Sequence, residues 1–77
     1  MAREQVTDIA AEMVANVLSV NVNPGDTIEP GQELVLLESM KMEIPVLAEH
    51  AGTVQAVKVI PGDVVQEGDV LVTVVTS

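Results

Sequence analysis

The 77-residue sequence contains no Cys, Phe, Tyr or Trp, and only three Lys and Arg residues against twelve Asp and Glu. Without Cys, the chain has no disulfide, no thiol nucleophile and no Cys-ligated metal site. The surplus of acids argues against nucleic acid as a partner, because phosphate binding needs clustered basic side chains. No apolar run approaches the roughly 20 residues of a membrane span, and no signal-peptide pattern opens the chain. We therefore expect a soluble, cytoplasmic protein that binds neither nucleic acid nor membrane.

Apolar residues make up 48% of the chain, and sixteen of them are Val. That content is too high for a disordered acidic chain, and β-branched side chains favour sheet over helix. A length of 77 residues supports one small domain and leaves little room for an enzyme with its own substrate cleft. The expected strands cover residues 17–22, 34–37, 44–47, 53–59 and 70–75. The Pro within 44–47 indicates a sheet edge or a strand start.

The sequence also repeats itself, with an offset of 37 residues. When residues 11–38 are laid on residues 48–75, eleven positions are identical, including two Pro-Gly-Asp turns. Because shared turns at shared spacing give a shared backbone path, we expect two similar halves of about four short strands each. One half alone would expose its apolar face, so the halves should form a flattened β-barrel or sandwich of two four-stranded antiparallel sheets. Residues 1–9 are expected to be a flexible arm, and residues 10–77 the domain.

Residues 39–47 join the two halves and contain Lys41, one of only two lysines in the chain. A two-fold relation between the halves places this segment opposite the chain termini, as a protruding hairpin. Lys58, the other lysine, lies within an alternating strand and is expected to be an ordinary solvated side chain. Met40 and Met42 flank Lys41. An exposed Met at a tip is unusual, because Met normally fills cores, but its flexible side chain also adapts well to partner surfaces. On spacing alone, a plain surface turn and a presented lysine are equally good interpretations.

The hexapeptide at residues 38–43, Glu-Ser-Met-Lys-Met-Glu, resembles the attachment motif of biotinyl domains, written (A/S)-M-K-M after a Glu. Turns similar to those of the family precede and follow it, so the resemblance covers residues 10–76. The sequence resembles the biotin/lipoyl attachment family, and within it the free-standing biotin carboxyl carrier proteins. It departs from the family at residues 11–15, Ala-Glu-Met-Val-Ala instead of Ala-Pro-Met-x-Gly, and at Glu49, where Pro is common. The thumb insertion of some acetyl-CoA carboxylase carriers has no counterpart.

The resemblance implies a non-catalytic carrier with one covalent cofactor, biotin. A biotin protein ligase would join biotin to Lys41 Nζ as an amide. The arm would then shuttle an activated carboxyl group between the biotin carboxylase and carboxyltransferase components of a biotin-dependent carboxylase. Glu38, Met40, Met42 and Glu43 would be recognised by the ligase or by these partners. Nothing in the sequence indicates a self-activated nucleophile, so the ligase would have to activate the Lys41 amine.

Two other functions remain as alternatives. Lipoyl carriers of 2-oxo acid dehydrogenases or of the glycine cleavage system share the family's fold, but typically have Asp-Lys-Ala rather than Met-Lys-Met. An unmodified barrel-sandwich assembly module would need no exposed tip lysine. No acid-base or nucleophile constellation indicates an enzyme.

The remaining polar residues suggest no further site. His50 stands without a second His or a Cys, so no metal site is expected. Asp26, Asp63 and Asp69 lie beside Gly in turns, where they are expected to shape the turn rather than bind calcium. Nothing in the sequence demands more than a monomer.

Overall fold

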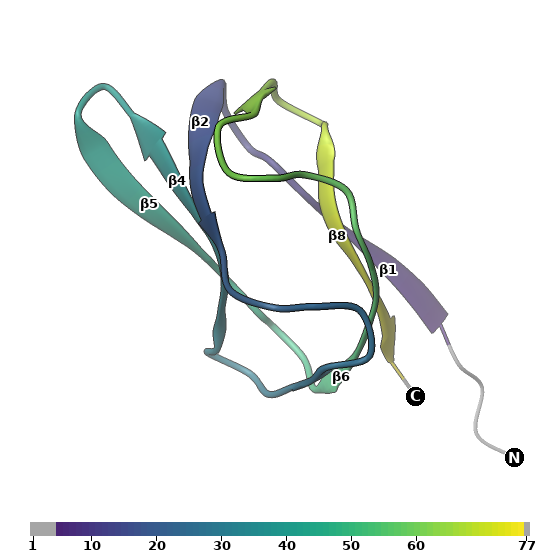
Figure 1. Ribbon diagram of the computed structural model, residues 1–77. Helices are drawn as coiled ribbons and strands as arrows, with labels where there is room; N and C mark the ends of the chain where they lie inside the picture. The colour runs from purple at the N-terminus through teal and green to yellow at the C-terminus, as the bar shows by residue number, and fades with distance from the viewer. Residues whose placement is uncertain (1–4, 77) are drawn as a thin grey trace, which may run out of the picture.

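The computed structural model describes residues 5–76, which form eight β-strands and no α-helix. The strands are β1 (Gln5–Ala10), β2 (Ala15–Val20), β3 (Thr27–Ile28), β4 (Glu33–Ser39), β5 (Met42–Leu47), β6 (Gly52–Val57), β7 (Val64–Val65) and β8 (Val70–Thr76). They form two four-stranded antiparallel sheets, with the strand orders β1-β8-β6-β3 and β5-β4-β2-β7 (Figure 1). The predicted all-β sandwich is confirmed, and the two sheets do not close into a barrel. Over residues 5–76, there is also no helix long and apolar enough to cross a membrane.

The 37-residue repeat is a pseudo-two-fold symmetry of the backbone. Adding 37 to the bounds of β1, β2, β3 and β4 gives the bounds of β5, β6, β7 and β8. The same shift converts the strand order of one sheet into that of the other. Each sheet therefore takes two strands from each half of the sequence. The expected halves are true repeats, but they interleave instead of forming separate layers.

The expected flexible arm over residues 1–9 is wrong for the part that the structure describes. Residues 5–9 belong to β1, which pairs with β8 from Gln5 opposite Thr76 to Ala10 opposite Val70. Residues 1–4 lie outside the described residues. The repeat does not reveal this strand, because β1 shares no identical residue with its repeat mate β5. Its backbone is ordered because it completes the hydrogen bonding of β8, the neighbouring central strand.

The other expected strands lie within two residues of β2, β4, β5, β6 and β8. The two-residue strands β3 and β7 fall between successive turns, where no periodic pattern can reveal them. β1 and β5 each pair along one side only, so both are edge strands. Pro45 lies within β5, which confirms the edge position that its missing N–H indicates. The repeat mate of Pro45 in β1 is Asp8.

The core follows the same symmetry. Fifteen apolar residues are buried, and all but one of them form repeat pairs. Ala15, whose mate is Gly52, is the exception. These aliphatic side chains fill a molecule that is 45 Å long but only 19 Å by 17 Å across. The pairs are Ala11 and Ala48, Val17 and Val54, Val22 and Val59, Ile28 and Val65, Leu34 and Leu71, Val35 and Val72, and Leu37 and Val74.

Four tight turns share one design, with Gly at the third position. The φ angles of these glycines lie between +87° and +97°, a conformation that favours Gly. In each turn, the backbone N–H of the first residue donates to the side chain of the fourth, over 2.8 to 3.1 Å. The fourth residues are Asp26, Gln32, Asp63 and Asp69, which confirms the three acids as turn formers.

The turns also connect the two halves of the sequence. The Gly25 N–H donates to the Val54 carbonyl over 2.8 Å, and its repeat mate, the Gly62 N–H, donates to the Val17 carbonyl over 2.8 Å. The Val54 and Val17 amides return the contact, to the carbonyls of Asp26 and Asp63 respectively. Each half therefore completes the backbone hydrogen bonding of the other, which fixes the two sheets in one rigid frame.

We predict that Gly52→Ala destabilises the fold through crowding at the start of β6. A Cβ at this position would lie 2.5 Å from the Val75 carbonyl oxygen and 2.8 Å from Val74 Cγ1. The free energy of unfolding should fall by roughly 1 to 3 kcal/mol. Urea denaturation followed by circular dichroism measures this, since the chain has no Trp or Tyr fluorescence.

Gln55→Ala is the matched control, because Gln55 is exposed in the same strand. Its effect should stay within about 0.5 kcal/mol. An equally small effect for Gly52→Ala would show that the strands near Gly52 can separate freely.

Candidate functional site

The candidate site is the hairpin formed by β4 and β5. Ser39 pairs with Met42, so only Met40 and Lys41 lie in the turn. Both have positive φ, 53° and 65°, which is the signature of the type I′ turn that suits the twist of two-residue hairpins. For residues other than Gly, Asn or Asp, this conformation costs roughly 1 kcal/mol or more each. The sequence shows no Asn-Gly pair here, so the turn type could not be predicted from it.

The hairpin projects from the sandwich at the end opposite the chain termini (Figure 1), as the repeat predicts. Its base is anchored in the core, because Leu37 is 2% exposed and Ile44, opposite it on β5, packs against the core cluster. The residue pattern of the tip does not by itself reveal this anchoring pair. Its signal was present, since the repeat mate of Leu37 is Val74, another core residue. The anchor holds the turn in a fixed direction while leaving its side chains outside.

The three central side chains of the tip are all exposed. Met40 is 92% exposed and Met42 is 65% exposed, and Lys41 is exposed between them. Neither Met packs back onto the sandwich, although Met is a residue that usually fills cores. The Lys41 amine therefore stands on a rigid support, between two apolar, flexible and accessible thioethers.

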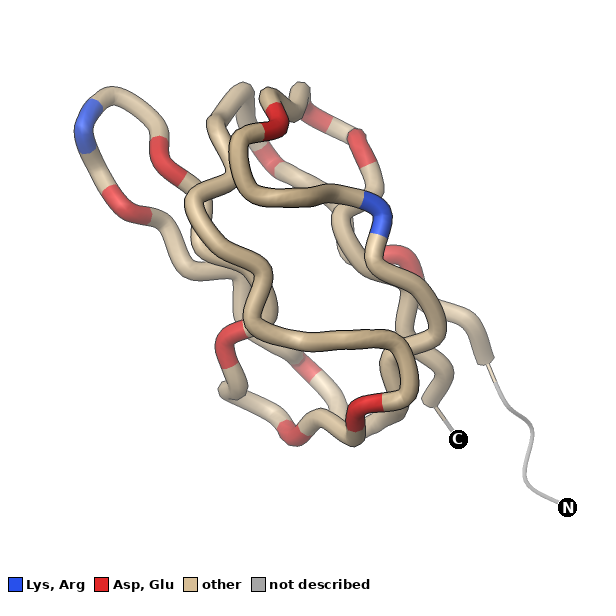
Figure 2. The backbone as a smooth tube through the Cα atoms, in the orientation of Figure 1, with Lys and Arg blue, Asp and Glu red and all other residues tan. Residues whose placement is uncertain are grey.

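Two carboxylates flank the tip. Glu38 lies opposite Glu43 in the pairing of β4 with β5, and Figure 2 shows acidic residues on both strands below the basic tip. Like charges directly opposite each other destabilise a sheet by about 0.2 to 1 kcal/mol. At the other end of the molecule, the repeat mates of this pair are Val6 and Val75, which also face each other. The fold thus accepts an apolar pair at this position, so packing alone does not require the acids.

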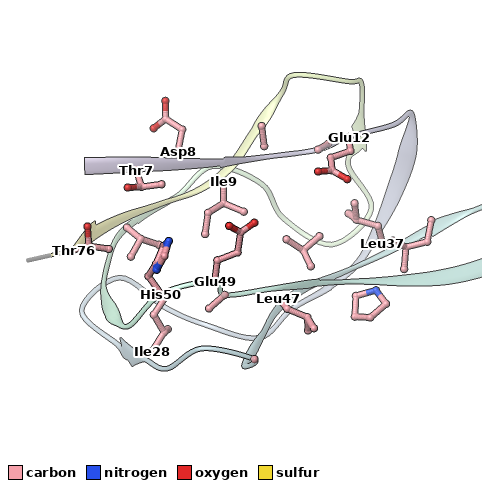
Figure 3. Close-up of a pocket in the computed structure, with 18 of the residues that line it drawn as sticks. Thr7, Asp8, Ile9, Glu12, Ile28, Leu37, Leu47, Glu49, His50 and Thr76 are labelled. Carbon is pink, nitrogen blue, oxygen red and sulfur yellow. The ribbon is translucent and has the colours of Figure 1, made fainter. Parts of the chain in front are cut away.

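A groove of about 750 Å³ runs between the edge strands β1 and β5 (Figure 3). Most of its lining residues form repeat pairs, such as Ile9 with Val46 and Glu12 with Glu49. The groove exists because the two sheets diverge where their edges are not paired with each other. Residues 39–43 do not line it, so the tip is separate from the groove and faces open solvent. His50 lies at the groove and not at the tip.

The geometry fits covalent attachment of a group better than its enclosure. A primary amine is exposed on a firm turn, and no cavity surrounds it. Residues 5–76 also contain no group of three or more His, Cys, Asp or Glu that could hold a metal ion. The site can present a group to other proteins, but residues that would perform chemistry on that group are not gathered around it.

Comparisons with known proteins agree with this geometry. Residues 5–74 match the biotin/lipoyl family described as biotin-requiring enzyme. Over 41 residues, 53% of the chain, the sequence is 68% identical to biotinylated protein TB7.3 of Mycobacterium tuberculosis. Those residues span 58% of the length of that relative.

Two solved structures share the fold. One is a single-chain, multi-domain long-chain acyl-CoA carboxylase, with a TM-score of 0.87 and 32% identity, covering 94% of this chain and 7% of that one. The other is the lipoyl domain of the 2-oxoglutarate dehydrogenase complex from Azotobacter vinelandii, with a TM-score of 0.72 and 26% identity, covering 83% of this chain and 80% of that one. With its interleaved sheets, its tip lysine and a family match over nearly all of its length, the chain belongs to the biotin/lipoyl attachment family.

Proposed function

We propose that the chain is a biotin carboxyl carrier, with biotin attached to Lys41. The observation that carries the proposal is the exposed Lys41 between Met40 and Met42, on a type I′ turn anchored to the core. The Met-Lys-Met triplet favours biotin over lipoate, and a relative named a biotinylated protein is 68% identical over 41 residues. The chain itself performs no chemical step; it presents the amine and then positions the attached group.

Attachment would proceed at Lys41 Nζ. A biotin protein ligase would use ATP to join the biotin carboxyl group to a phosphate. The Lys41 amine, after losing a proton, would attack the carboxyl carbon. The amide C–N bond would form as the bond from that carbon to the phosphate oxygen breaks, and the phosphate group would leave. Held by the Lys41 side chain, biotin would supply a ring that can carry a carboxyl group between a biotin carboxylase and a carboxyltransferase. The firm hairpin limits motion to the Lys41 side chain and the group that it carries, so the arm swings while the domain stays docked.

Recognition by the ligase and by the carboxylase components is proposed for the side chains around Lys41. Met40 and Met42 offer apolar, adaptable contacts on both sides of the amine. Glu38 and Glu43 place two negative charges at the base of the tip, which favours partners with a basic surface. We propose that the carrier works in the cytoplasm and is a monomer in isolation.

The lipoyl carrier is the second candidate, because a lipoyl domain shares the fold with a TM-score of 0.72. One experiment separates the two functions. The purified protein is incubated with ATP and biotin plus a biotin protein ligase, or with ATP and lipoate plus a lipoyl ligase, and its intact mass is measured. We expect one biotin adduct per chain and no lipoyl adduct. The reverse result would assign the lipoyl function, and no adduct with either ligase would favour an assembly module.

We predict that Lys41→Arg abolishes biotin attachment and leaves the fold intact. Arg keeps the positive charge and the long side chain, but its guanidinium stays protonated and does not form the amide. Intact mass and peptide mapping after incubation with the ligase measure attachment, and circular dichroism measures folding. Lys58→Arg is the matched control and should accept biotin as the original chain does. Biotin retained on Lys41→Arg would refute the assignment of the site.

We also predict that moving the lysine by one position reduces attachment by about tenfold or more. The exchanges are Met40→Lys with Lys41→Met, and Lys41→Met with Met42→Lys. Each exchange keeps the composition of the tip. The amine then points in another direction, because the lysine no longer occupies the second position of the turn. Initial rates with limiting ligase measure the effect, and equal rates would show that the ligase does not select its target by presentation.

A third prediction concerns the strained turn. Met40→Asn should raise the free energy of unfolding by roughly 0.5 to 1 kcal/mol, because Asn tolerates positive φ better than Met. The same variant should accept biotin more slowly, since it loses the apolar contact. Met42→Asn is the control, because Met42 lies in β5 outside the turn and should gain no stability. Urea denaturation measures the free energy of unfolding and ligase assays measure the rate of attachment. Together they test whether Met40 lowers stability while raising the rate of attachment.

A further inference from the structure

Among the methionines that the structure describes, Met40 has the most exposed side chain. Its exposed fraction is 92%, compared with 65% for Met42 and 38% for Met13. The chain contains no Cys, Trp or Tyr, so the thioether sulfurs of Met are its most readily oxidised side-chain groups. A small oxidant dissolved in water reaches the Met40 sulfur without any opening of the fold.

Oxidation of Met40 should leave the fold unchanged. A methionine sulfoxide disrupts a core because it replaces an apolar side chain with a polar one. Met40 makes no such contribution here, since its side chain lies outside the core at the turn. The consequence of oxidation is therefore confined to the surface beside Lys41, where any protein that handles the lysine must also contact its neighbour.

We propose that Met40 is an oxidation site at which a peroxide lowers the acceptance of biotin by Lys41. This inference rests on the proposed function of Lys41. The Met40 sulfur attacks hydrogen peroxide with an electron pair, the O–O bond breaks, and one oxygen becomes bonded to sulfur. The other oxygen leaves as water, so the sulfur is oxidised by two electrons and the peroxide is reduced. A thiol-dependent methionine sulfoxide reductase reverses the change, forming a disulfide in the reductant and water.

The effect on Lys41 follows from the change in polarity. The sulfoxide oxygen is a strong hydrogen-bond acceptor, and burying it against an apolar partner surface costs free energy. We expect the initial rate of ligation to fall about fivefold, which corresponds to about 1 kcal/mol in the transition state. The sequence neighbours of Lys41 thereby make the attachment site responsive to oxidants, although the chain has no cysteine.

The first part of the test maps the order of oxidation. The folded protein is treated with limiting hydrogen peroxide, and peptide mass mapping follows each methionine over time. Among the three methionines of residues 5–76, Met40 should be oxidised first, Met42 next and Met13 last, in the order of their exposed fractions. Oxidation of Met13 as fast as Met40 in the folded protein would overturn the assignment of the site.

The second part measures ligation before and after the same peroxide dose. The original chain and Met13→Leu should lose rate about fivefold, and methionine sulfoxide reductase with a thiol should restore it. Met40→Leu, compared with its own untreated sample, should keep most of its rate. Circular dichroism should show unchanged folding in every sample.

Three results would overturn the proposal. These are an undiminished rate for protein oxidised at Met40, the same fractional loss in Met40→Leu, and no recovery with the reductase. They differ from a failure of the proposed function, in which even the untreated chain accepts no biotin.

Discussion

Backbone hydrogen bonds exchanged between the two halves of the sequence are the constraint on which the structure depends. The turn glycines of one half donate to strands of the other, and those strands donate back. Neither half alone can satisfy its backbone or cover its apolar face, so the two must fold together. Over residues 5–76, the result is a rigid frame built without aromatic side chains, disulfides or helices, from aliphatic residues most of which meet in repeat pairs.

The candidate site lies where the two-fold symmetry is broken. At one end of the frame, β4 continues through the turn into β5, and the acids Glu38 and Glu43 face each other below Lys41. At the equivalent end, Val6 and Val75 face each other beside the chain termini. Because the frame accepts both arrangements, its packing does not dictate which residues occupy the tip. That freedom explains how a Met and a Lys occupy turn positions that Gly or Asn would fill at lower free energy.

The sequence predicts the turns, the central strands and the tip position of Lys41, because Pro-Gly-Asp triplets and their repeat specify the backbone path. It does not predict β1, since Gln5–Ala10 has little apolar alternation and no identity with β5. The interleaving of the sheets is also hidden, because a repeat identifies equivalent strands without saying which of them pair. The positive φ angles at Met40 and Lys41 arise from closure of the hairpin. They cannot be predicted from the sequence, because neither Met nor Lys favours positive φ.

The unpaired edges of β1 and β5 determine whether two copies of the domain can lie close together without joining their sheets. An unpaired edge is a template on which another chain can extend a sheet. On β5, Pro45 lacks the N–H that such an extension needs, and on β1 its repeat mate Asp8 carries a charge. Two copies meeting through β1 would bring their Asp8 carboxylates together, and a net charge of −9 adds to the repulsion. Two copies can therefore lie close together without joining their sheets, and the tip of each stays exposed.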